Sequence, residues 1–236
     1  MPLVKEEYYK NMLKNKKVAL VGPSKTIEGT GQGKKIDSYD IVVRLNRALS
    51  HLNGKEQDLG ERTDILFACL STGFVGQKHP RTKKLEVDIG QYEKSKIQLI
   101  STAFPSDFGI KQNVNNVLNN SSLKLREIPT QTYAKIKSLA ACHPNTGFIA
   151  ILDLLGTELE ELFITGLDFH RTTYLSDYET YTWQEQKNLF LHSSQHDPDK
   201  QFKYFKYNVY SKDSRVTVDK SLNTFLSDKK YELTLR

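Results

Sequence analysis

Short apolar runs, separated by polar or glycine-containing segments, are the main pattern along this 236-residue chain. Runs of this length, bounded by turn residues, are typical of buried strands in a parallel sheet. We predict strands at Val18–Val21, Ile41–Val43, Ile65–Phe67, Gln98–Ile100 and Leu162–Ile164.

Helical patterns alternate with these runs. Glu6 to Asn15 carries apolar residues at helical spacing, which predicts a short leading helix. The segment that begins at Thr146 is apolar on all sides, as a buried helix should be, and Asn145 is a suitable N-cap. Alternating strands and helices predict one Rossmann-like, three-layer α/β domain with a mostly parallel sheet.

The chain length suits a single domain covering residues 1–236. We divide it into a leading helix (1–17), a core (18–205) and a basic, aromatic C-terminal segment (206–236). Residues 200–236 hold nine Lys or Arg and four Asp or Glu, which is nearly all of the net charge of +6. No nucleic-acid motif accompanies this charge, so we expect no nucleic acid partner. An anionic membrane surface is one expected partner, and a packed helix and strand with a charged outer face is the alternative.

The stretch from Val18 to Asn46 holds the first candidate chemistry. Its first strand ends at a turn, Gly22-Pro23-Ser24, and a glycine-rich loop follows at Gly29–Gly33. The second strand then leads to Arg44 and Asn46, which strand alternation would point to the same side. This arrangement suggests a site for a nucleotide and its phosphate.

Two familiar phosphate motifs do not fit this loop. A Walker A loop would need Gly where Glu28 stands and Ser or Thr where Lys35 stands. A dinucleotide-binding fingerprint needs G-x-G-x-x-G directly after the strand, whereas these glycines run G-x-G-x-G and start later. A loop whose glycines serve only flexibility remains an alternative.

The same stretch resembles the large sialyl motif of the animal-type sialyltransferases, a strand and glycine loop that run on to R-x-N. The similarity continues through Glu56–Thr63, which is like the family's E-x-D-V-G-x-R-T. The matching positions of the first part are Gly22, Ser24, Gly29, Gly31, Gly33, Ile36, Asp37, Arg44 and Asn46.

A second stretch, Pro144–Gly147, resembles the small sialyl motif, with Asn145 in place of its Ser. An apolar helix and a strand that ends near Asp168 follow it. The N–H groups of Asn145, Thr146 and Gly147 would point out of a helix N-terminus, where a phosphate binds well.

A third stretch, His196-Asp197, is similar to the His-Asp of the family's last motif, which carries its proposed catalytic base. We therefore expect His196 to be the base and Asp197 to orient it, although Gln201 stands near the place of the motif's Glu. His192 is the nearest alternative. The family's short aromatic motif has no clean match. Its candidates are His170, Tyr174, Tyr178 and Tyr181.

The resemblance implies an inverting glycosyltransferase, a sialyltransferase-like variant of the GT-A fold. It would move a 2-keto sugar acid, sialic acid or Kdo, from its CMP donor to the hydroxyl of a glycan or glycolipid. Gly22, Ser24 and Asn46 are the expected donor contacts from the first motif. Arg44 could bind the donor's carboxylate or pair with Asp58. The alternative from another class is a catalytically silent nucleotide-binding or interaction domain.

No cofactor or metal is expected, because a CMP donor carries one phosphate that helix N–H groups can stabilise. An alternative hypothesis is that Asp197 and Asp199, which form an Asp-x-Asp pattern, bind a metal ion. The two cysteines, Cys69 and Cys142, do not match the family's disulfide, since Val18 stands near one of its positions. With no long apolar run and a polar start, this predicts a cytoplasmic enzyme, peripheral at the inner face of the membrane, in microbial surface polysaccharide or lipopolysaccharide synthesis.

Overall fold

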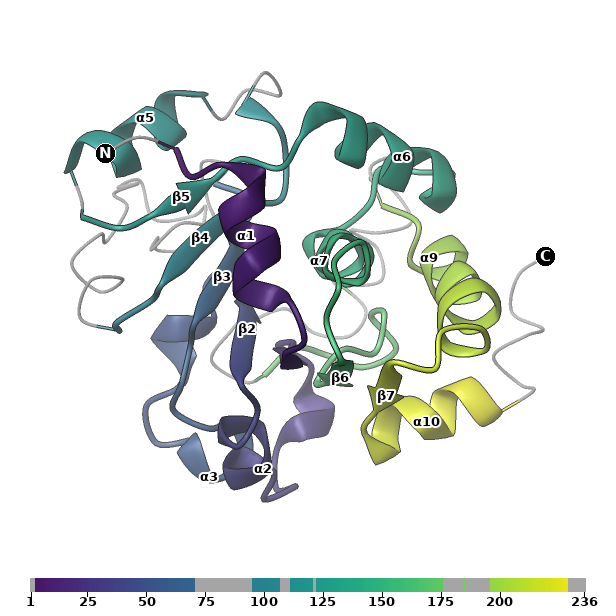
Figure 1. The fold of residues 1–236 in the computed structure, drawn as a ribbon. Coiled ribbons are helices and arrows are strands. Elements are labelled where there is room, and N and C mark those ends of the chain that lie inside the picture. Colours follow the sequence, from purple (N-terminus) through teal and green to yellow (C-terminus); the bar gives the residue numbers. More distant parts are fainter. Residues whose placement is uncertain are drawn as a thin grey trace.

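The computed structural model describes residues 3–70, 95–106, 111–120, 122–175, 185 and 196–228. Within them, a seven-stranded sheet with the order β5-β4-β3-β2-β1-β6-β7 forms the centre of the molecule (Figure 1). All its strand pairs are parallel, which confirms the predicted sheet. The strands are β1 (Lys17–Val21), β2 (Ile41–Leu45), β3 (Ile65–Ala68), β4 (Leu99–Thr102), β5 (Leu125–Arg126), β6 (Glu161–Thr165) and β7 (Val216–Val218).

Helices cover both faces of this sheet, so the predicted three layers are present (Figure 1). The α-helices are α1 (Glu6–Leu13), α2 (Gly33–Asp37), α3 (Glu56–Leu59), α5 (Lys111–Asn120), α6 (Thr130–Ala140), α7 (Thr146–Leu155), α9 (Pro198–Tyr204) and α10 (Lys220–Ser227). Two short 3-10 turns, η1 (Lys25–Ile27) and η2 (Ala48–His51), and a π-helical segment, η4 (Phe205–Tyr210), complete the described elements.

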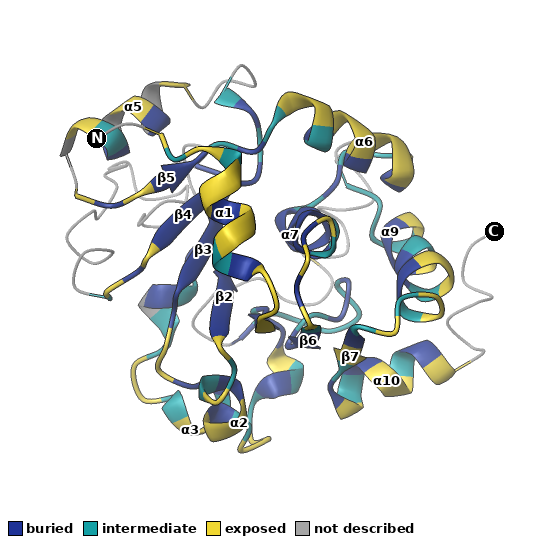
Figure 2. Ribbon diagram, in the orientation of Figure 1, coloured by how far each residue is buried: buried dark blue, intermediate teal, exposed yellow. Residues whose placement is uncertain are grey.

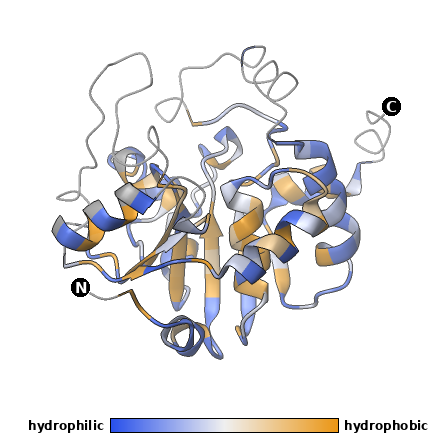
Figure 3. Ribbon diagram, turned by 90° about the horizontal axis from the view of Figure 1, so that it is seen from above, coloured by the Kyte–Doolittle hydropathy of each residue, from blue (hydrophilic) through white to orange (hydrophobic). Residues whose placement is uncertain are grey.

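Strand alternation divides the apolar side chains between the two faces. In β1, Val18 and Leu20 join the largest cluster, with α1, α6, α7 and α9, while Ala19 and Val21 face α2 and α3. A third cluster lies between α5 and the strands β3, β4 and β5. Figure 3 shows the apolar residues gathered on the strands and on the helix sides that face them.

Helix α7 is the most deeply buried helix, as its all-round apolar sequence predicts (Figure 2). Asn145 caps it as expected, because its side chain accepts a hydrogen bond from Phe148 N at 2.8 Å. A Cβ on Gly147 would lie 3.0 Å from Leu167 and 3.4 Å from Leu45, which follow β6 and end β2 respectively. The N-terminus of α7 therefore lies at the carboxyl ends of the strands.

Strand β5 was not predicted, and β7, which α10 follows, is the strand of the packed helix and strand given as the alternative for the C-terminal segment. β5 is two residues long, and β7 lies inside the basic C-terminal segment. Asp219, which follows β7, accepts hydrogen bonds from Gly166 N and from Thr165 Oγ1 at 2.9 and 2.8 Å. The C-terminal segment therefore extends the sheet and supports the turn after β6.

Candidate active site

The turns after β1 and β6 are packed together at the carboxyl edge of the sheet. Gly22 N donates to Thr165 O at 2.9 Å, and Ser24 N donates to Gly166 O at 2.8 Å. A Cβ on Gly22 would overlap the carbonyl oxygen of Gly166, so this approach requires glycine. Because Leu167 contacts both Gly22 and Gly147, the structure brings the Gly22 turn and the start of α7 together, as the sequence predicts.

Asn46 links this edge to α7. Its φ of 48° takes the chain out of β2, so the alternation of the strand does not extend to it. Its Oδ1 accepts from Cys69 N at 3.0 Å, and its Nδ2 lies 3.4 Å from Thr146 Oγ1. The expectation that Arg44 and Asn46 point to the same side is therefore wrong.

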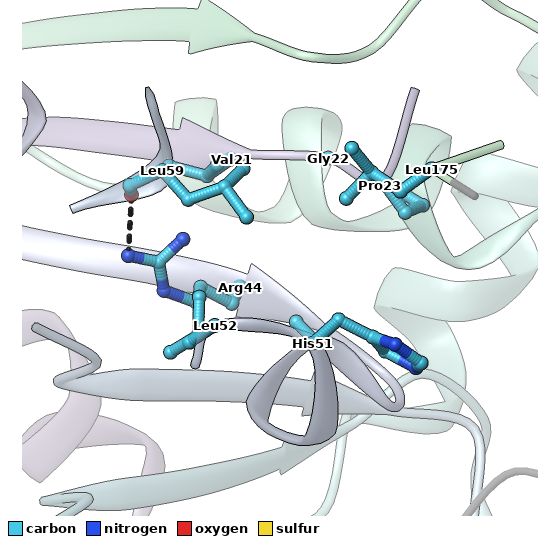
Figure 4. A pocket seen from close by; sticks show the side chains of 9 residues that line it. Val21, Gly22, Pro23, Arg44, His51, Leu52, Leu59 and Leu175 are labelled. Atoms are coloured by element: carbon cyan, nitrogen blue, oxygen red, sulfur yellow. Dashed lines mark hydrogen bonds between the residues drawn. The ribbon is translucent and has the colours of Figure 1, made fainter. Parts of the chain in front are cut away.

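Arg44 has a structural role. It is 1% exposed, and its guanidinium donates to the carbonyl oxygen of Leu59 at 2.7 Å (Figure 4). It also donates to the carbonyl oxygen of Arg62 at 3.0 Å. Burial lowers the pKa of Arg44 to about 10, so it stays charged at neutral pH. Its Nε and Nη2 are therefore engaged by the protein. The expected pairing with Asp58 is not formed, because the carboxylate of Asp58 contacts the glycine loop.

Figure 4 also shows a small pocket beside Arg44, on the face of the sheet opposite α7. Its lining is mostly apolar. It is lined by Val21, Gly22, Pro23, Arg44, Ala48, His51, Leu52, Leu59 and Leu175.

The glycine-rich loop is held by the second half of the large motif. The carboxylate of Asp58 accepts hydrogen bonds from Gly29 N at 2.7 Å and Gly31 N at 2.8 Å. A Cβ on Gly33 would overlap the carbonyl oxygen of Glu56, so Gly33 permits the contact between α2 and α3. The N–H groups of Gly29 and Gly31 are therefore bonded within the protein itself.

Ser24 and Asp168 form a buried polar cluster. Ser24 Oγ donates to Asp168 Oδ2 at 2.9 Å, and Thr172 N donates to the same carboxylate at 2.8 Å. Both side chains are at most 5% exposed, and burial raises the pKa of Asp168. Ser24, an expected donor contact, is bonded here to protein groups. These bonds stabilise the turns after β1 and β6.

The N-terminus of α7 offers two free donors instead of the three expected. Asn145 N is bonded to Gln201 Oε1 at 3.1 Å. Within the described part of the chain, no protein acceptor is found for the N–H groups of Thr146 and Gly147. These two groups, close to Asn46, form a place where an anion could bind.

Gln201 joins α9 to this helix start, a role that the sequence reasoning missed. It is fully buried, and its Nε2 donates to Asp197 O at 3.3 Å and to Cys142 Sγ at 3.6 Å. The sequence showed Gln201 only as a departure from the family's Glu. Its position five residues after His196, on a helix facing α7, was the signal available.

His196 lies next to this helix start with a defined tautomer. Its Nδ1 is 2.8 Å from the carbonyl oxygen of His143. Since a carbonyl can only accept, Nδ1 carries the proton and Nε2 keeps its lone pair. Burial lowers the pKa of His196, and the bond to His143 offsets part of that shift. A neutral imidazole whose Nε2 carries no proton can act as a general base.

Asp197 does not orient this imidazole through its carboxylate, which corrects the expectation. It caps α9 by accepting from Lys200 N at 3.0 Å and pairs with Lys200 Nζ at 3.5 Å. Asp199 is bonded to Arg171 at 2.7 Å. Both carboxylates of the rival metal pair are therefore engaged with the protein. Among the described residues, no group of three or more His, Cys, Asp or Glu could hold a metal ion.

His170 completes the cluster at the start of α7. Its Nε2 lies 3.4 Å from Asn145 Nδ2, and its ring meets Tyr174 edge-on at 5.6 Å. Burial, and the charges of His196 and Arg171, lower the pKa of His170 to about 3. Both His170 and the preceding Phe169 have positive φ, which is a strained backbone typical of functional sites. Tyr178, Tyr181 and His192 lie outside the described residues.

These features define a class of protein. A parallel α/β sheet whose polar groups and helix N-terminus meet at the carboxyl ends of the strands is the arrangement of a nucleotide-binding domain. A family model narrows the class: glycosyltransferase family 29 (sialyltransferase) matches residues 3–121, half of the chain. The chain belongs to this family and is a glycosyltransferase.

Solved structures show the same fold. A crystal structure of a mammalian sialyltransferase is similar with a TM-score of 0.56 at 16% identity, covering 92% of this chain and 73% of that one. A crystal structure of a mammalian sialyltransferase in complex with Gal-beta-1-3GalNAc-ortho-nitrophenol has a TM-score of 0.54 at 16% identity, covering 92% of this chain and 74% of that one. The sialyltransferase CstII from Campylobacter jejuni, in complex with cytidine-5'-monophosphate, has a TM-score of 0.53 at 15% identity, covering 82% and 75%. No curated protein sequence was matched.

Proposed function

We propose that this glycosyltransferase moves a 2-keto sugar acid from a CMP donor to a hydroxyl group of a glycan, with inversion at the anomeric carbon. Sialic acid is the donor sugar that the family supports, and Kdo is the alternative. The observation that carries the proposal is the imidazole of His196, whose Nδ1 carries the proton and whose ring lies against His143, just before the start of α7.

The described residues suit each step of such a transfer. His196 Nε2 would take the proton of the acceptor hydroxyl while the oxygen of that hydroxyl attacks the anomeric carbon of the donor sugar. The bond from that carbon to the phosphate oxygen breaks, and CMP leaves with the electron pair. The N–H groups of Thr146 and Gly147 would stabilise the negative charge on the departing phosphate.

Similar proteins support both substrates. CstII binds cytidine-5'-monophosphate, and the mammalian enzyme binds a Gal-beta-1-3GalNAc derivative. By analogy, we propose a glycan or glycolipid acceptor for this chain, in the synthesis of a microbial surface polysaccharide or lipopolysaccharide. Cys69 and Cys142 are not joined in a disulfide, which suits the reducing cytoplasm, where CMP sugars would reach the enzyme.

The replacement His196→Ala tests the function. We expect kcat with CMP-sialic acid or CMP-Kdo to fall about 10²- to 10⁴-fold, the usual range for loss of a general base. The affinity for CMP should stay the same, because the imidazole would face the acceptor. Release of CMP and the mass of the product report turnover, and a CMP titration reports binding.

The matched control is His192→Ala, which removes a histidine four residues earlier in sequence. It should keep its turnover. If His192→Ala is inactive while His196→Ala is normal, the base is misassigned. If the unchanged protein binds CMP but turns over neither donor, it is a silent nucleotide-binding domain.

A further inference from the structure

A third histidine, His143, lies directly against His196. It stands between α6 and α7, and its ring meets the His196 ring nearly at right angles, with 5.6 Å between centroids. On its other sides it packs against Phe104 at 5.5 Å and Tyr133 at 6.3 Å. Three rings therefore surround His143, and one of them is the imidazole of the proposed base, His196.

The polar atoms of His143 are poorly satisfied for a residue that only fills space. Its Nε2 is 3.4 Å from the hydroxyl of Tyr133, and its Nδ1 is buried without a hydrogen-bond partner among the described residues. A buried polar atom without a partner reduces stability, whereas a phenyl ring would fill the same space without that cost. An imidazole at this position therefore calls for a reason beyond packing.

We infer that His143 is a positioning residue for His196, an inference that rests on the function proposed above. The main chain of His143 fixes the tautomer of His196, and its imidazole holds the neighbouring ring in place and opposes its protonation. His143 does not itself need to touch the substrate.

The physical basis is the repulsion between two imidazolium ions in contact. A positive charge on His143 lowers the pKa of His196, in addition to the effect of burial. The result is a base that stays unprotonated at neutral pH.

Other titratable groups around the pair are placed differently. Arg171 is paired with Asp199, and Asp197 is paired with Lys200. The remaining groups that face the pair are Tyr133 on α6, Cys142 beside His143 and His170 after β6. His143, by contrast, packs its ring against the His196 ring, and its carbonyl oxygen accepts the hydrogen bond from His196 Nδ1.

His143→Phe is the test, because it keeps the ring shape and the main-chain carbonyl but removes the charge. We expect the acid side of the kcat/KM profile to move to higher pH by about 0.5–1 unit, with the KM for the CMP donor unchanged. His51→Phe is the matched control, since His51 lies on the opposite face of the sheet; it should leave the profile in place. A profile that does not move in His143→Phe overturns the inference.

Nitrogen-15 spectra of the histidines of the unchanged protein provide a measurement that does not depend on folding of a variant or on turnover. Neutral His196 should carry its proton on Nδ1, the nitrogen bonded to the His143 carbonyl oxygen. A proton on Nε2 contradicts the inference. If His196 is not the base, His196→Ala should turn over normally. Failure of the proposed function can therefore be distinguished from failure of the inference about His143.

Discussion

His196 gains the properties of a base from one neighbouring residue and from burial, and not from its own sequence motif. The carbonyl of His143 selects the tautomer, and burial keeps the ring neutral. Asp197, the next residue in sequence, belongs to the cap of α9 instead. A carboxylate next to a histidine in sequence is therefore a poor guide to its partner in space.

The state of His196 predicts the pH dependence of turnover. Only the neutral form accepts a proton, so kcat/KM should be constant above the pKa of His196 and fall tenfold per pH unit below it. Because burial lowers this pKa, the inflection should lie below the ordinary histidine value of about 6.5. His170, with a pKa of about 3, should not contribute between pH 5 and 8. Initial rates over that range check this, and an inflection at or above pH 7 contradicts it.

At the scale of elements, a buried ionic network joins α1, β5 and α7. Arg126, fully buried at the end of β5, bonds Asp153 of α7 at 2.8 Å and Glu6 of α1 at 2.8 Å. The hydroxyl of Tyr9, on α1, donates to Asp153 at 2.8 Å. The guanidinium carbon of Arg126 lies over the Tyr9 ring, 3.7 Å from the ring centroid. Burial lowers the pKa of Arg126, but the charge of Asp153 and the bond to Glu6 raise it by more than burial lowers it. Arg126 is therefore charged. The network holds α7 in the position that sets its N-terminus.

Breaking this network should destabilise the protein. In Arg126→Ala, Asp153 would remain buried without a counter-charge, which costs about 3–5 kcal/mol of the free energy of unfolding. Urea denaturation measures the change. The control is Lys14→Ala, which removes an exposed ion pair with Glu158 and should leave the urea midpoint unchanged. Equal stability of Arg126→Ala and the original chain would show that the network does not hold α1 and α7.

At the scale of the whole molecule, positive charge gathers in the C-terminal part. Lys203 and Lys212 are exposed there, on or just after α9 and η4, and Tyr207 between them is 46% exposed. Side chains of this kind suit a surface of anionic lipid, which would keep the enzyme close to a glycolipid acceptor. No helix in the described parts of the chain is long and apolar enough to cross a membrane.

Vesicle sedimentation tests this contact. We expect binding to vesicles with anionic phospholipid, weaker binding to neutral ones, and a loss of binding as salt rises. The double replacement Lys203→Glu and Lys212→Glu should weaken binding, at about 1 kcal/mol or more per lysine. The charge-matched control, Lys10→Glu with Lys14→Glu on and beside α1, should bind like the original. Equal loss in both pairs would show that net charge alone matters.

Metal independence is the second prediction for the whole enzyme. Turnover should stay within about twofold in EDTA, because helix N–H groups can stabilise the leaving CMP without a metal. A CMP-release assay with and without EDTA, followed by added magnesium or manganese, makes the comparison. Activity that is lost in EDTA and restored by either ion would revive a metal site.

The sequence by itself determined the central strands, the buried helix with its Asn145 cap, and the family. Apolar runs and N-cap chemistry are local properties, so five of the seven strands and the start of α7 could be read from residue order. The two strands that could not be placed are short, and their position in the sheet depends on pairing with β4 and β6. Pairing of distant segments is not a local property.

Only the tertiary structure decided what the motif residues do. Arg44, Ser24 and Asp58 match the family's pattern, yet the structure bonds all three to protein groups more than ten residues away in sequence. Conversely, Gln201 and His143 appear unremarkable in the sequence but contact Asn145 and His196. A motif specifies residue types and their order. Which of them face a ligand and which hold the turns together depends on the packing of α7, α9 and the turns after β1 and β6, and packing is fixed only when the chain has folded.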